Sequence, residues 1–244
     1  MGQVVFVTSG KGGTGKSSVS VGLGAALALR GRRTLLIDGD AGLRSLDIMM
    51  GVADQVVYDL NDVFDGRCEP IRAIVESSVI EGFSLLPAPS SSRLEEDPAD
   101  MRRLCRGLAR YFDMVLIDSP AGVGPEFSIC AAAADRAFVV ALPDPVCIRS
   151  AERVGRLLQS AGVSDRRLII NRYDPSVIRN GLVTDLDEVI DRVGLQLLGV
   201  IPEDGVLRAC FSRGAPLEEK SPAGAAFARL AARLDGEKVP IGIY

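Results

Sequence analysis

The chain has 244 residues, of which 47% are hydrophobic and 25% charged, and its formal net charge is −4. This length suits one α/β domain with a large core, and the negative charge disfavours non-specific nucleic-acid binding. The sequence has no run of eighteen apolar residues, so no membrane span is predicted. The chain has no histidine and its five cysteines form no C-x-x-C pair, which favours buried thiols in a reducing cytosol over a metal or iron–sulfur site.

The first predicted element is a strand over 3–8, and because it begins so early it leaves no room for a signal peptide. The glycine-rich segment 10–17 follows it. This segment reads G-x-x-x-x-G-K-S, a phosphate-binding loop whose backbone N–H groups close around phosphate oxygens. The next helix would direct its positive N-terminal dipole at the same anion. Lys16 would then meet the β- and γ-phosphates, and the Ser17 hydroxyl would bind Mg²⁺. Lys11, a second lysine in the loop, is a candidate to supply charge from one subunit to another.

The same glycines also fit a dinucleotide fingerprint, with Asp38 on a ribose hydroxyl. A pyrophosphate bound on backbone amides has no need of Lys16 and Ser17. Asp118, at the end of a later strand, also supplies the carboxylate that a Mg²⁺–nucleotide site requires. The triphosphate interpretation is therefore favoured.

The second predicted strand, over 33–38, runs into Asp38-Gly39-Asp40. The two carboxylates at the end of this strand are predicted to have different tasks. One would orient Mg²⁺ or Lys16 and the other would position the attacking water; the alternative is a simple polar turn. The strand over 113–118 ends on Asp118, expected to bind Mg²⁺ through a water, although such a residue can also be a helix cap. The segment 119–122 is a candidate sensor of the γ-phosphate.

Further strands are predicted over 83–86, 137–142, 167–171 and 196–201, and they alternate with helical patterns. The first helix has a stop signal at Gly31 and the last a start signal at Ser221-Pro222. Residues 54–80 are expected to hold short helices, and 87–98 a surface loop leading into a helix. The alternation predicts one α/β domain over 1–244, with a P-loop NTPase-like, mostly parallel sheet and helices on both faces. The segments 10–16, 38–40 and 118–122 would converge at its carboxyl edge.

The loop pattern K-G-G-x-G-K-[ST]-[ST], from Lys11 to Ser18, resembles the deviant Walker A ATPases of the MinD/ParA group. Segments 37–47, 56–60, 118–122, 171–175 and 199–204 extend the likeness over about residues 3–240 and favour the MinD branch. The resemblance implies an ATPase that uses ATP, ADP and Mg²⁺, dimerises with ATP between its subunits and acts in choosing the division site.

The resemblance also implies a set of site residues. Lys11 would reach the partner's nucleotide, Asp40 would position water, and Asn171 and Arg172 with 202–204 would surround adenine. The catalytic residues would be Lys11, Lys16 and Asp40, and the metal ligands Ser17, Asp38 and Asp118. The nucleotide-binding residues would be Gly10, Lys11, Gly12, Gly13, Thr14, Gly15, Lys16, Ser17, Ser18, Asn171, Arg172, Pro202, Glu203 and Asp204.

The implied partners are a second copy of the chain, a MinC-like division inhibitor and a MinE-like activator, with no nucleic acid expected. The family usually ends in a basic amphipathic helix that binds the membrane surface. Residues 238–244 contain one basic residue, a proline and a glycine, a composition that does not predict a membrane-binding helix. We therefore expect a cytoplasmic protein, which would bind the membrane surface only in a form that carries such a helix. Gly124 stands where the family tends to have glutamate, with Glu126 two residues later, and Ser45 replaces a usual asparagine.

Two other functions stay open at this point. One is another ParA-group ATPase, for DNA partition or flagellar number. The other is a nucleotide-binding scaffold without hydrolysis, against which the retained Lys11, Lys16, Asp40 and Asp118 speak.

Overall fold

The centre of the molecule is a sheet whose strands lie in the order β3-β4-β2-β5-β1-β6-β7-β8. The structure, a computed structural model, describes residues 1–41, 44–89, 96–120, 122–183, 185–215 and 217–242. All neighbouring strands pair in parallel except β3, which is antiparallel to β4. The strands are β1 (Gln3–Thr8), β2 (Thr34–Asp38), β3 (Val75–Glu76), β4 (Phe83–Leu86), β5 (Met114–Asp118), β6 (Arg136–Ala141), β7 (Asp165–Tyr173) and β8 (Gln196–Pro202).

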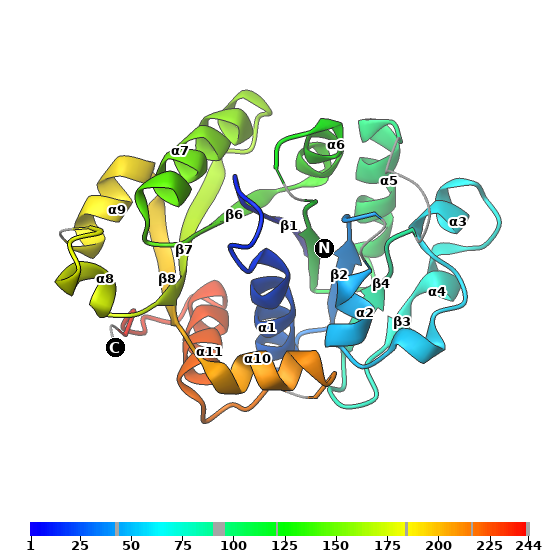
Figure 1. Ribbon diagram of the computed structural model, residues 1–244. Coiled ribbons are helices and arrows are strands. Elements are labelled where there is room, and N and C mark those ends of the chain that lie inside the picture. The colour runs from blue at the N-terminus through cyan, green and yellow to red at the C-terminus, as the bar shows by residue number, and fades with distance from the viewer. Residues whose placement is uncertain (42–43, 90–95, 121, 184, 216, 243–244) are drawn as a thin grey trace.

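Helices cover both faces of this sheet, with one apolar cluster on each side (Figure 1). One face is covered by α3 (Leu60–Phe64), α5 (Pro98–Leu108), α6 (Pro125–Ala133), α7 (Pro145–Ser160) and α9 (Leu186–Val193). The other is covered by α1 (Lys16–Leu29), α2 (Ser45–Met49), α10 (Gly205–Ser212) and α11 (Pro222–Leu234). Three further short helices are η1 (Ala53–Gln55), α4 (Pro70–Ala73) and α8 (Ser176–Arg179). This confirms the predicted α/β class with helices on both faces.

The predicted strands are confirmed to within one residue at every end except those of β7, which starts two residues earlier and ends two residues later than expected. The sequence did not predict β3, because a two-residue edge strand carries no periodic pattern. Residues 54–80 hold the short helices expected there. Of the loop expected over 87–98, positions 90–95 lie outside the described residues, and α5 begins at Pro98 as predicted.

Helix α1 is held in place by close packing against α11. A Cβ atom at Gly22 would lie 2.4 Å from the ring of Phe227, which is fully buried, so only glycine permits this approach. The α11 helix starts where the sequence predicts, since the Ser221 side chain accepts a hydrogen bond from Gly224 N. This packing fixes the helix that carries Lys16 at its first position.

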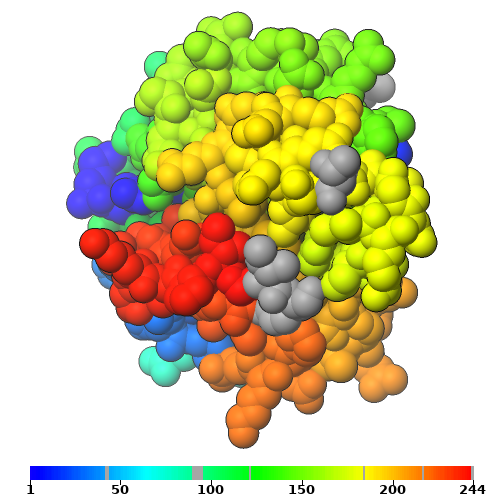
Figure 2. All heavy atoms as spheres, turned by 90° about the vertical axis from the view of Figure 1, so that its left-hand side faces the viewer, coloured from blue at the N-terminus to red at the C-terminus, as the bar shows by residue number. Residues whose placement is uncertain are grey.

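The last described residues pass along the edge of the sheet next to β8. The side chain of Ile241 packs against the cluster of the α7–α9 face, although α11 belongs to the opposite face. Figure 2 looks at this edge and shows the red C-terminal residues beside the yellow surface of α8 and α9. No helix among the described residues has the length and apolar character needed to cross a membrane.

Candidate functional site

The glycine-rich segment forms a loop between β1 and α1, at the carboxyl edge of the sheet. Gly13 and Gly15 have φ angles of 81° and 85°, in the left-handed region that favours glycine. A Cβ atom at Gly15 would also lie 2.3 Å from the Asn171 amide nitrogen. Lys16 is the first residue of α1 and is 8% exposed, so its charge is held within the loop rather than in solvent. This is the geometry of an anion site at a helix N-terminus.

Asp118 at the end of β5 is bonded to α1 through both of its carboxylate oxygens. The Ser17 hydroxyl donates to Oδ2 at 2.7 Å, and the Ser20 hydroxyl donates to Oδ1 at 2.7 Å. The predicted metal ligands Ser17 and Asp118 thus meet, although they are 101 residues apart in the chain. Sequence reasoning missed Ser20; the available signal was a second hydroxyl three positions after Ser17, on the same face of the helix.

Asp38 and Asp118 end neighbouring strands and lie directly opposite each other in the β2–β5 register. Burial, reinforced by the nearby Asp118 carboxylate, raises the pKa of Asp38 to about 8. Burial also raises the pKa of Asp118, while the Lys16 charge and the two serine hydroxyls act in the opposite direction. Asp38 Oδ1 accepts a hydrogen bond from Asp40 N at 3.0 Å. Asp38 is 2% exposed whereas Asp40 is only half-buried, so the two carboxylates of this turn have different surroundings.

These oxygen atoms fit Mg²⁺. Carboxylates and a hydroxyl are the hard ligands that this ion prefers, and it usually binds through one or two carboxylates together with substrate phosphates. A cation beside Asp38 and Asp118 would favour their ionised forms, which burial opposes. Within the described parts of the chain, no group of three or more His, Cys, Asp or Glu side chains is arranged to hold a metal ion. The arrangement therefore suits an ion that is completed by nucleotide phosphates, not a closed metal cage.

A cavity of about 580 Å³ opens beside the loop, between the ends of β7 and β8 and the helices α2 and α10. Among its lining residues, those predicted to bind nucleotide are Gly13, Gly15, Ser18, Asn171, Arg172, Pro202, Glu203 and Asp204. Those that sequence reasoning missed are Ser45, Ile48, Met49, Leu207, Arg208, Phe211 and Ser212. The missed residues belong to α2 and α10, two short helices that were not predicted from the sequence.

Asn171 connects the end of β7 to the phosphate loop. It is 4% exposed, and its Nδ2 donates a hydrogen bond to the Thr14 carbonyl oxygen at 2.8 Å. The next residue, Arg172, has a φ of 53° and its Nε lies 2.5 Å from Glu203 Oε2. Glu203 also forms an ion pair with Arg208 of α10. These contacts bring β7, β8, α10 and the loop together around one cavity.

Both carboxylate oxygens of Asp204 accept backbone hydrogen bonds. Oδ1 accepts from Val206 N at 2.8 Å, which caps α10, and Oδ2 accepts from Ala223 N at 3.0 Å, which joins it to α11. The side chain thus sets the position of the α10 wall of the cavity.

The remaining predicted residues lie at the exposed side of the loop. Lys11 and Gly12 are exposed, and Lys11 forms no ion pair with any residue that the structure describes. A Cβ atom at Gly10 would lie 2.5 Å from the Ser150 carbonyl oxygen, so the loop packs directly on α7. Glu126 Oε2 lies 2.8 Å from the Cβ position of Gly124. The Glu126 carboxylate therefore occupies the space beside Gly124 that a side chain there would use.

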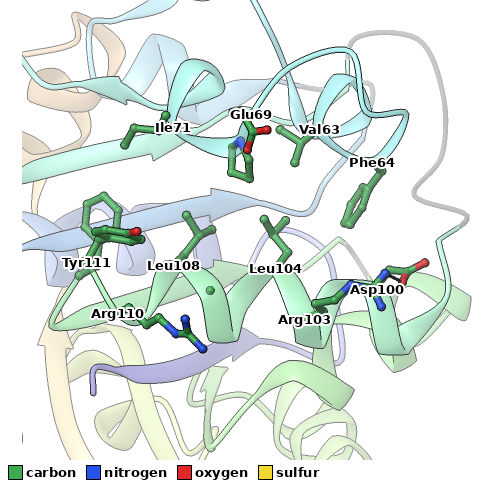
Figure 3. Close-up of a pocket in the computed structure, with 13 residues that line it drawn as sticks. Val63, Phe64, Glu69, Ile71, Asp100, Arg103, Leu104, Leu108, Arg110 and Tyr111 are labelled. Atoms are coloured by element: carbon green, nitrogen blue, oxygen red, sulfur yellow. Dashed lines mark hydrogen bonds and ion pairs between the residues drawn. The ribbon is translucent and has the colours of Figure 1, made fainter.

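A second cavity, of about 630 Å³, lies between α3, α4 and α5 (Figure 3). Apolar side chains of Val63 and Ile71 face Leu104 and Leu108 across it. It contains none of the predicted site residues and no glycine loop. The cavity beside the phosphate loop is therefore the candidate nucleotide site.

Comparison with known proteins identifies the family of the chain. Residues 5–217 match the CobQ/CobB/MinD/ParA nucleotide binding domain. The septum site-determining protein MinD of Bacillus subtilis is 36% identical, with 100% of this chain and 92% of that protein covered. MinD in the MinC:MinD complex of Aquifex aeolicus has a TM-score of 0.92 at 35% identity, with 99% of both chains covered. MinD of Pyrococcus horikoshii, complexed with Mg-ADP, has a TM-score of 0.85 at 31% identity, with 96% of both chains covered. The chain belongs to the MinD family within the CobQ/CobB/MinD/ParA nucleotide-binding domain group.

Proposed function

We propose that this protein is a Mg²⁺-dependent ATPase that acts as an ATP-dependent dimerising switch in division septum site selection. It would convert ATP and water to ADP and phosphate. The observation that carries the proposal is the meeting of Ser17 and Asp118 at 2.7 Å, next to Lys16 at the N-terminus of α1. This contact joins the phosphate loop to the acidic strand end, which a Mg²⁺–triphosphate site requires. Membership of the MinD family supports the same activity.

Each proposed residue has a physical task in this reaction. The loop N–H groups and Lys16 would bind and orient the β- and γ-phosphates, and Ser17, Asp38 and Asp118 would hold Mg²⁺. When bound, Mg²⁺ supplies neutralising charge for the phosphate oxygens. Asp40 would orient the attacking water, since it is half-buried and lies within the field of Lys16.

The 580 Å³ cavity would hold the nucleoside. Asn171 and Arg172, with 202–204, form one wall, and α10 forms another. The Asn171 amide nitrogen is committed to Thr14 O, which leaves its Oδ1 as an acceptor for a base amino group. ATP and ADP are the proposed ligands on this basis.

The proposed partners follow from the family. MinD of Aquifex aeolicus has been solved in a MinC:MinD complex, and we propose a MinC-like partner for this chain. Lys11 would reach the nucleotide of a second subunit, because it is exposed and forms no ion pair among the described residues; within its own chain its charge acts on Asp144. A MinE-like activator, and membrane attachment in a form that carries a C-terminal amphipathic helix, are proposed by resemblance alone. The single-domain organisation over 1–244 is proposed in the same way.

The test is binding of a fluorescent ATP analogue to Lys16→Ala. We expect binding to be abolished, because the variant leaves phosphate charge without its nearest cation. Lys220→Ala, which removes an exposed lysine that does not line the cavity, is the matched control and should bind like the wild type. Affinity of Lys16→Ala within threefold of the wild type would reject the site. Binding without phosphate release by the wild type would favour the scaffold alternative.

A further inference from the structure

The Ser20 hydroxyl takes part in the site through the carboxylate of Asp118. Ser20 is fully buried, one helical turn beyond Ser17 on α1, and donates to Asp118 Oδ1 at 2.7 Å. Ser17 donates to the other oxygen, Oδ2, at the same distance. Asp118 is itself 0% exposed, so these two hydroxyls act on a carboxylate that has no access to bulk water.

The two serines are not equivalent. Ser17 directly follows Lys16, where the loop motif places a Mg²⁺ ligand, and its lone pairs stay available to a cation while its O–H donates to Asp118. Ser20 is one turn deeper in the helix and meets only the far oxygen, Oδ1. Each oxygen of the Asp118 carboxylate therefore accepts a hydrogen bond from a different serine: Oδ1 from Ser20, and Oδ2 from Ser17.

We propose that Ser20 is a positioning residue for Mg²⁺: by holding Oδ1, it fixes the plane of the Asp118 carboxylate and presents Oδ2 beside Ser17. The inference rests on the proposed Mg²⁺–nucleotide site and adds a residue that the loop motif does not contain. Without the Ser20 hydroxyl, Oδ1 loses this donor, and the carboxylate is free to turn about its Cβ–Cγ bond. This rotation weakens its hold on a metal-bound water. Loss of such outer-shell partners typically lowers metal affinity about 10- to 100-fold.

The experiment separates nucleotide binding from metal binding in the whole chain. A fluorescent ADP analogue is first bound in EDTA, and Mg²⁺ is then titrated into the complex; Mn²⁺ bound to the same complex is counted by electron paramagnetic resonance. We expect Ser20→Ala to bind nucleotide in EDTA within about twofold of the wild type and to need about 10- to 100-fold more Mg²⁺. Ser84→Ala removes another buried hydroxyl, from β4, where Ser84 is 7% exposed, and should titrate like the wild type.

A double-mutant cycle with Asp118→Ala shows whether Ser20 acts through Asp118. We expect Ser20→Ala to change Mg²⁺ affinity in the native background and to have little further effect once Asp118 is alanine. The same factor in both backgrounds, or an equal loss of nucleotide affinity in EDTA, would overturn the proposal, because either result describes a packing defect. Wild-type protein whose nucleotide binding ignores Mg²⁺ would instead overturn the proposed function, and this is seen before any variant is compared.

Discussion

Asn171 lies 157 positions from Thr14 in the chain, yet its side-chain amide donates to the Thr14 carbonyl oxygen at 2.8 Å. Thr14 is 2% exposed, so its carbonyl oxygen lies in a region with little access to solvent. The same amide group lies where a side chain at Gly15 would have to go. One buried residue thus holds the phosphate loop in shape from the opposite side of the cavity.

We predict that Asn171→Ala weakens binding of the ATP analogue by about 5- to 150-fold, because an unsatisfied buried carbonyl costs about 1–3 kcal/mol. Asn171→Asp should be worse, since a carboxylate can only accept hydrogen bonds and would face the Thr14 oxygen. Asn180→Ala, at an exposed asparagine, is the control. Fluorescence titration measures all three, and wild-type affinity in Asn171→Ala would show that the contact does not shape the loop.

At the scale of elements, close packing and not helix propensity explains the glycine at position 22 of α1. In an exposed helix, alanine is favoured over glycine by about 0.5–1 kcal/mol. Gly22 is an exception, because α11 approaches it through Phe227 at 2.4 Å from the ideal Cβ position. Gly107 of α5 has no atom within 4 Å of that position and is exposed. The two sites therefore predict opposite signs for the same substitution.

We expect Gly22→Ala to destabilise the protein by about 1–3 kcal/mol through overpacking. Gly107→Ala should stabilise it by about 0.5–1 kcal/mol. Urea denaturation at 25 °C gives both values. A gain in stability for Gly22→Ala would mean that α1 and α11 separate more easily than their packing indicates.

The starts of β6 and β7 are joined by an ion cluster whose effect depends on pH. Partial burial alone would raise the pKa of Asp165, but hydrogen bonds from Arg136 and Arg167 outweigh it and lower the pKa below its usual value. The Arg167 Nε lies 2.8 Å from Asp165 Oδ1. A carboxyl group whose pKa is lower in the folded state stabilises the fold at pH values above its pKa in the unfolded chain, which is about 3.9. This stabilisation is lost as the pH falls through the pKa of the folded state.

Asp165→Asn should therefore lower the free energy of unfolding at pH 7 and have a much smaller effect near pH 3. Urea denaturation at both values tests this, with Asp187→Asn, on the exposed face of α9, as the control. An equal loss at both pH values would assign the effect to packing, not to charge.

At the scale of the whole molecule, the loop side of the site is open. Lys16 is buried in the loop, whereas Lys11 is exposed at its outer end and has no ion pair among the residues that the structure describes. Phosphoryl transfer depends on charge neutralisation, and a lysine from a second subunit would supply it as an arginine finger does. The site is therefore expected to be completed by a second copy of the chain.

We predict ATP-dependent dimerisation that requires Lys11. With ATP and Mg²⁺, Asp40→Ala should slow turnover and give a dimer by light scattering. Adding Lys11→Ala should return the protein to a monomer, while adding Lys220→Ala should not. If the Lys11 double variant dimerises as well as Asp40→Ala alone, Lys11 does not act across subunits.

The sequence by itself determined the strands other than β3, the phosphate loop and the acidic strand ends. These features are local: glycines at positive φ, a lysine at a helix start, and apolar strands that end in aspartate each leave a signal within a few residues. Because parallel strands share one carboxyl edge, the convergence of 10–16, 38–40 and 118–122 also followed from the pattern.

Only the tertiary structure decided which other residues complete the site. The bonds of Ser20 to Asp118 and of Asn171 to Thr14 join positions 98 and 157 residues apart. The α10 wall and the two-residue strand β3 are likewise set by packing between distant segments. An apolar pattern shows that a helix has a buried face, but not which neighbour that face meets, because the pattern is the same for a core contact and for a cavity wall.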